Sequence, residues 1–88
     1  MNLEEIKNQL RRKGYTSFIL RSDPPGKSYE MLPIPEVAAY RVLDGELMLI
    51  IGEISHLLKI NDEYEVPAND KHSLRAGMNG CEYLIARI

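Results

Sequence analysis

The chain has 88 residues, of which 44% are hydrophobic and 27% charged. This is the ordinary composition of one globular domain, and it excludes the disordered, fibrous and disulfide-scaffold classes. Eleven Lys and Arg residues against thirteen Asp and Glu residues give a formal net charge of −2, which is too small for the basic footprint of a nucleic-acid or anionic-lipid binder. We therefore expect neither nucleic acid nor a membrane as a partner.

The amino-terminal segment has the pattern of one short amphipathic helix. Asn2 and Glu5 form a capping pair, and basic residues at 11–13 close the helix where its dipole favours positive charge. Three apolar residues fall on one face: Leu3, Ile6 and Leu10. Gly14 supplies a left-handed stop, so we expect residues 1–14 to form a helix that packs on the remaining 15–88 in a single domain.

From residue 15 onward the chain consists of short β-rich runs separated by turn residues. The expected strands are 15–21, 29–32, 39–43, 46–51, 54–60, 63–66, 72–76 and 82–88. The expected turns are 23–26, 44–45, 52–53, 61–62, 67–70 and 77–80. Many short strands in a small chain favour an all-β barrel or jelly roll, because these architectures limit exposed sheet edges.

Cellular location is indicated by three further features. The single cysteine, Cys81, cannot form a disulfide within the chain, and the first ten residues carry acidic side chains where a signal peptide would be apolar. The longest apolar run, 47–51, is far shorter than the roughly 20 residues of a membrane span. We expect a cytoplasmic protein with an inert thiol.

Residues 40–47, 52–53 and 61–73 closely resemble the core of a small cupin. The second cupin motif, G-x5-P-x-G-x2-H-x3-N, is matched by Pro67 and His72, with Asn61 and Asn69 in place of its two glycines. Asparagine tolerates the left-handed backbone for which a turn otherwise selects glycine, so we expect both turns to survive. The resemblance implies a cupin-type double-stranded β-helix, a jelly-roll barrel, with one short N-terminal α-helix.

The first cupin motif, G-x5-H-x-H-x(3,4)-E-x6-G, is not kept. Counting back from Gly45 puts Ala38 at the carboxylate position. The two histidine positions hold apolar residues in either spacing, Leu32 and Ile34 or Met31 and Pro33. In cupins that keep these residues they hold a divalent metal in the barrel. Since three of the four positions donate nothing, we expect no metal and no cofactor here.

His72 is the remaining polar residue of this arrangement. It shares strand parity with Leu74 and Ala76, which places it inside the barrel. Tyr40 shares parity with Ala38 on its own strand and could contact His72. The two residues could form the polar part of a ligand pocket at the barrel mouth, or they could be satisfied core residues. The candidate pocket residues are His72, Tyr40, Leu32, Ile34, Ala38, Leu74 and Ala76.

His56 is the other histidine. Its parity with Leu58 allows an inward position, but a lone histidine on such a strand is more often structural or exposed at a rim. His56, His72 and Cys81 contain no close-spaced pair, which disfavours a zinc site.

Three functions remain open, because the cupin fold hosts enzymes, binders and regulators. The first is a metal-poor module that binds a small molecule or a partner, without catalysis. The second is an isomerase or metal-dependent oxygenase that uses His72 and Tyr40 as acid and base. The third is a structural or regulatory dimer with a filled barrel. We also expect a homodimer, because the core is small and the apolar strand at 15–21 needs cover.

Overall fold

The computed structural model describes residues 2–31 and 33–88. One helix precedes six strands: α1 (Leu3–Arg12), β1 (Ser17–Asp23), β2 (Ser28–Met31), β3 (Ala38–Ile51), β4 (Ile54–Leu58), β5 (Glu63–Val66) and β6 (His72–Arg87). All strand pairings are antiparallel. The expected all-β fold with one short N-terminal helix is confirmed. No helix in the described ranges has the length and apolar content needed to cross a membrane.

Helix α1 begins at the predicted cap. The Asn2 side-chain oxygen accepts a hydrogen bond from the Glu5 backbone N–H at 2.9 Å, and the Asn2 amide donates to the Glu5 carboxylate at 3.0 Å. Gly14, just past the helix, has φ +103°, a left-handed conformation that costs glycine little. The reciprocal capping pair and the glycine stop therefore act as expected.

The two longest strands correct the sequence prediction. Segments 44–45 and 77–80 were expected to be turns, but β3 and β6 each run through them without reversing. The two strands pair with each other on both sides of the bend, with register shifts between Val42 and Asp44 and between Gly45 and Leu47. Gly45 and Gly80 have φ +76° and +77°, so these glycines bend and bulge a continuous ladder instead of ending it.

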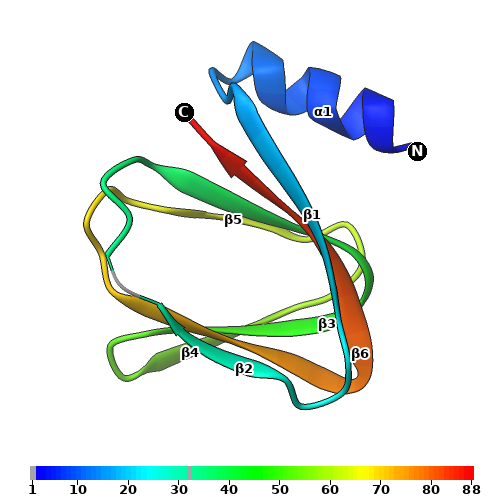
Figure 1. The fold of residues 1–88 in the computed structure, drawn as a ribbon, viewed down its shortest axis with the longest axis vertical. Coiled ribbons are helices and arrows are strands. Elements are labelled where there is room, and N and C mark those ends of the chain that lie inside the picture. Colours follow the sequence, from blue (N-terminus) through cyan, green and yellow to red (C-terminus); the bar gives the residue numbers. More distant parts are fainter. Residues whose placement is uncertain (1, 32) are drawn as a thin grey trace.

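These bends divide the sheet into two layers that face each other (Figure 1). In one layer the first part of β3 and the last part of β6 pair with β5 and β1. In the other layer the remaining parts of β3 and β6 pair with β4 and β2. The core between the layers includes Ala38, Tyr40, Val42, Leu47, Leu49, Leu74, Tyr83 and Ile85. This is the double-stranded β-helix that the motif resemblance implied.

The two loops that flank β5 use asparagine as predicted. Asn61 and Asn69 have φ +72° and +67°, so they hold the left-handed positions of the motif's two glycines. The Asn69 N–H also donates to the carbonyl of Ile34 at 2.7 Å. This contact fixes the turn before β6 against the segment that leads into β3.

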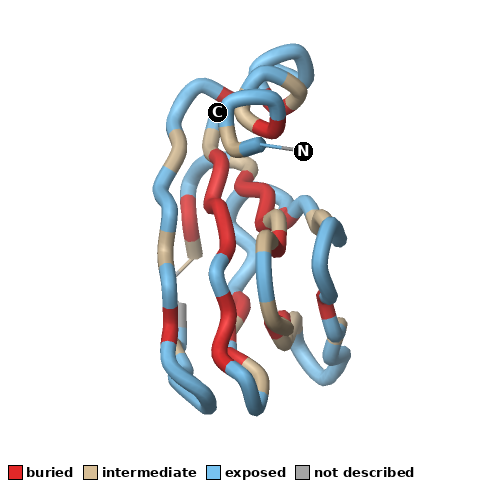
Figure 2. Tube along the Cα trace, turned by 90° about the vertical axis from the view of Figure 1, so that its right-hand side faces the viewer, coloured by how far each residue is buried: buried red, intermediate tan, exposed pale blue. Residues whose placement is uncertain are grey.

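Helix α1 covers the outer face of the β5-β3-β6-β1 layer. Ile6 and Leu10 form a second buried cluster with Tyr15, Ala39, Leu84 and Ala86, and Figure 2 shows the buried part of α1 turned toward the sheet. Lys13 donates to the Glu63 carboxylate at 2.9 Å and so links the end of the helix to β5. Arg11 and Arg12, the basic residues of the last turn, remain exposed.

The bend of β3 gives a test of the fold. A Cβ added at Gly45 would lie 2.2 Å from the Gly80 carbonyl oxygen, whereas one added at Gly52 would meet nothing within 4 Å. Both glycines have positive φ, so both substitutions strain the backbone by about 1 kcal/mol. We expect Gly45→Ala to lower the free energy of unfolding by roughly 3 kcal/mol or more, as measured by urea denaturation. Equal losses for Gly45→Ala and Gly52→Ala would contradict the close approach of β3 and β6.

Candidate functional site

The structure brings Tyr40 and His72 together inside the barrel. The Tyr40 hydroxyl lies 2.6 Å from His72 Nε2, and the two rings meet edge to face with centroids 5.4 Å apart. Tyr40 comes from the first part of β3 and His72 from the start of β6. The bends of the two long strands therefore make this contact possible, since they fold the two layers over each other.

The surrounding hydrogen bonds assign the His72 tautomer. Its Nδ1 lies 3.0 Å from the backbone carbonyl oxygen of Asp70, and a carbonyl can only accept. Nδ1 therefore carries a proton, and in the neutral ring Nε2 accepts from the Tyr40 hydroxyl. Both ring nitrogens of His72 are engaged within the chain.

The other candidate pocket residues lie around this pair. Ile34, Ala38, Leu74 and Ala76 belong to the same buried cluster as Tyr40, and Leu32 lies outside the described residues. Ala38 and Tyr40 are 0% exposed and Leu74 is 1% exposed, so almost none of their surface could touch a water molecule. Burial raises the pKa of Tyr40 to about 12, which keeps its hydroxyl neutral and able to donate at physiological pH.

These residues do not fit the divalent metal that the cupin motif implies. Ile34 and Ala38 carry no donor side chain, and Glu36 and Asp70 are exposed at the surface. Within residues 2–31 and 33–88, no group of three or more His, Cys, Asp or Glu side chains could hold a metal ion. The Nε2 lone pair of His72, which a metal would need, already accepts from Tyr40.

His56 and Cys81 lie apart from the pair. The His56 ring is half-buried and packs at a tilt over Tyr64, with centroids 4.5 Å apart. Cys81 is buried, and burial, followed by the nearby carboxylates Asp23, Asp44 and Glu82, raises the pKa of its thiol to about 11. A protonated buried thiol is a poor nucleophile, in agreement with the expectation of an inert cysteine.

A buried carboxylate was missed in the sequence. Asp23 was assigned only to a turn, but it accepts hydrogen bonds from the hydroxyls of Tyr29 at 2.8 Å and Tyr83 at 2.6 Å. The Arg21 guanidinium lies over both tyrosine rings, 4.7 and 5.8 Å from their centroids. The cluster joins β1, β2 and β6. No sequence signal pairs Asp23 with Tyr83, which lies at the opposite end of the chain.

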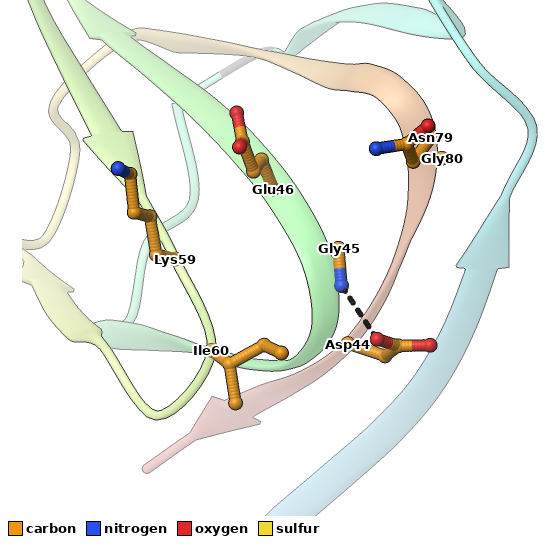
Figure 3. A pocket seen from close by; sticks show the side chains of 7 residues that line it. All are labelled: Asp44, Gly45, Glu46, Lys59, Ile60, Asn79 and Gly80. Atoms are coloured by element: carbon orange, nitrogen blue, oxygen red, sulfur yellow. Dashed lines mark hydrogen bonds between the residues drawn. The ribbon is translucent and has the colours of Figure 1, made fainter.

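A hollow of about 460 Å³ lies beside the bends of β3 and β6. Figure 3 shows its side chains coming from the two bends and from the segment that follows β4: Asp44, Gly45, Glu46, Lys59, Ile60, Asn79 and Gly80. The Gly45 N–H donates to the Asp44 carboxylate at 3.0 Å. Charges of both signs line this hollow, so it has no clear preference for an anion or a cation.

A second hollow, of about 790 Å³, lies on the outer face of the β4-β3-β6-β2 layer. Met48, Ile50 and Leu57 form its apolar centre, and Glu46 and Arg75 also line it. The sequence indicated the β3 part of this face, because residues 47–51 are apolar at the inward and at the outward positions of the strand. Leu47 and Leu49 are buried in the core, whereas Met48 and Ile50 are only partly covered.

Comparison with solved structures identifies the fold, although no family model and no curated protein matches the sequence. A cupin superfamily protein from Desulfitobacterium hafniense superposes with a TM-score of 0.75 at 24% identity, over 81% of this chain and 64% of that one. A predicted oxalate decarboxylase from Thermotoga maritima gives 0.72 at 20% identity, over 92% and 72%. The cupin domain of an XRE family transcriptional regulator from Enterobacter cloacae gives 0.67 at 13% identity, over 82% and 96%.

The architecture and these neighbours agree: this is a small protein of cupin fold. The chain spans less than two thirds of the length of the Desulfitobacterium protein. Identities below one quarter establish the fold alone, so the function has to be argued from the residues of this chain.

The Tyr40–His72 hydrogen bond can be tested by removing the hydroxyl. We expect Tyr40→Phe to lower the free energy of unfolding by about 1–3 kcal/mol, because it leaves a buried His72 nitrogen without its donor. Urea denaturation measures the loss, and Tyr64→Phe, which keeps the ring beside His56, is the matched control. A Tyr40→Phe protein as stable as the wild type would mean that the hydrogen bond contributes nothing.

Proposed function

We propose that this protein is a metal-independent interaction module whose barrel interior is a packed core. The observation that supports this most directly is the near-complete burial of Ala38, Tyr40 and Leu74. These residues stand where the cupin motif and its neighbouring strands would line a pocket. Because these side chains are packed too closely for a water molecule to reach them, they fill the barrel interior themselves.

The polar pair supports the same interpretation. Acid–base catalysis needs a group that can reach the proton of a substrate. His72 donates to the carbonyl of Asp70 and accepts from Tyr40, and burial keeps the Tyr40 hydroxyl protonated. Each group thus has a partner within the chain, as expected of polar residues that stabilise a core.

The structural neighbours are consistent with more than one function. One is described as a predicted oxalate decarboxylase and another as the cupin domain of a transcriptional regulator. This chain spans 96% of the regulator's cupin domain. Of these two alternatives, a small interaction domain fits a filled interior and an apolar outer hollow better than an enzyme does.

A second candidate is the binding of a small, largely apolar molecule at the barrel mouth. It is favoured by the polar pair, which lies within an apolar cluster that includes Ile34, Ala38 and Leu74. A ligand there would have to displace wall residues and take over one hydrogen bond of His72. The open surface of the outer hollow requires neither change, so we prefer the interaction module.

Overpacking distinguishes a filled interior from an open pocket. Ala38→Leu adds three carbon atoms inside the barrel, and in a packed core we expect a loss of about 1–3 kcal/mol in the free energy of unfolding. Ala68→Leu, at an exposed position in the 67–70 turn, is the matched control and should be neutral. If Ala38→Leu were neutral or stabilising, the barrel would contain space and the ligand-binding candidate would be preferred.

Metal and ligand content can be measured together. We expect native mass spectrometry of the freshly purified protein to give the mass of the bare chain or its multiples, and added chelator to leave the melting temperature unchanged, because a ligand bound only to the folded state would raise it. One equivalent of a transition metal per chain would contradict metal independence. An organic adduct lost in His72→Ala would instead identify the barrel mouth as a ligand site.

A further inference from the structure

The two outer faces of the barrel differ in how they are covered. Helix α1 places Ile6 and Leu10 against the outer face of the β5-β3-β6-β1 layer. The outer face of the β4-β3-β6-β2 layer instead carries the 790 Å³ hollow, with Met48, Ile50 and Leu57 at its centre. We call this second surface the hollow face.

We propose that the hollow face binds the hollow face of a second copy of this chain about a twofold axis. This inference rests on the proposed interaction function and names its partner. Met78 of each copy enters the hollow of the other, and Glu46 of each copy lies opposite Arg75 of the other. A twofold contact requires a self-complementary surface, and this face carries an exposed methionine beside an apolar hollow and side chains of both charges.

The apolar centre supplies the shape. Met48 and Leu57 lie directly opposite each other on β3 and β4, and Ile50 continues the row on β3. Met78, at the rim of the hollow, is 93% exposed. One protruding flexible side chain and one apolar hollow on the same face are what two identical surfaces need to interlock.

The charges at the face are also self-complementary. Glu46 and Arg75 both line the hollow, and neither forms an ion pair within the described part of the chain. A face with charge of only one sign would repel its own copy. Here one acid and one base allow each copy to offer the opposite charge to the other.

The chain also has a competing apolar surface on β1. Ile19 and Leu20 are 41% and 51% exposed, and β1 lies at an edge of the sheet. A small hollow of about 250 Å³ beside α1 includes Leu20. Leu20 and Leu57 are both strand leucines that are about half exposed, so they form a matched pair for an experiment.

Light scattering and sedimentation at micromolar concentration test the proposal. We expect the wild type to have twice the mass of the chain, Leu57→Glu to be monomeric, and Leu20→Glu to remain a dimer. Glu46→Arg and Arg75→Glu should each weaken the dimer at least tenfold. The double variant Glu46→Arg/Arg75→Glu should restore it, because the opposite charges again face each other.

Melting curves show whether each variant folds, and the double variant separates a lost contact from a damaged fold. A monomeric wild type would overturn self-association, as would a dimer that is lost in Leu20→Glu but kept in Leu57→Glu. A monomer in which Ala38→Leu still destabilises the barrel would leave the interaction function in place with a different partner. A barrel that accepts Ala38→Leu would overturn the filled interior whatever the oligomeric state.

Discussion

The close approach of two backbones at Gly45 and Gly80 is the constraint on which the rest of the structure depends. A side chain at Gly45 would collide with the Gly80 carbonyl, so only glycine allows β3 and β6 to bend together while they stay paired. The bend lets two strands serve both layers of the barrel. Without it, Tyr40 and His72 would lie far apart on one long sheet, and neither outer face would have its present shape.

The interior carries apolar residues and one polar pair at the positions where the cupin motif implies metal ligands. Apolar residues replace the expected ligands at Ile34 and Ala38, which leaves His72 as a buried polar group that needs partners. Tyr40 and the carbonyl of Asp70 supply them. A satisfied pair of this kind costs the core little, whereas an unsatisfied imidazole would cost about 1–3 kcal/mol.

The sequence predicts the local features well because each depends on near neighbours. The Asn2 cap, the left-handed Asn61 and Asn69, and the inward parity of His72 all follow from backbone sterics or strand alternation. The bends at 44–45 and 77–80 were misread as turns, since glycine permits a bulge as readily as a reversal. The Asp23 cluster depends on strands that meet only in the folded chain, so no local pattern reveals it, and the apolar run 47–51 indicates only the β3 part of the hollow face.

The position of β6 has a consequence for how the protein is made. This last strand pairs with β1, β2 and β3, so both layers lack a central strand until β6 has been synthesised. Until β6 is in place, β1 and β3 lack this partner, and unpaired strand edges are prone to wrong pairing. Folding then starts from contacts between distant segments, which is slow compared with the formation of helix α1. The barrel therefore closes only when β6 joins it, whereas helix α1 and the β3–β4 hairpin depend on contacts between near neighbours.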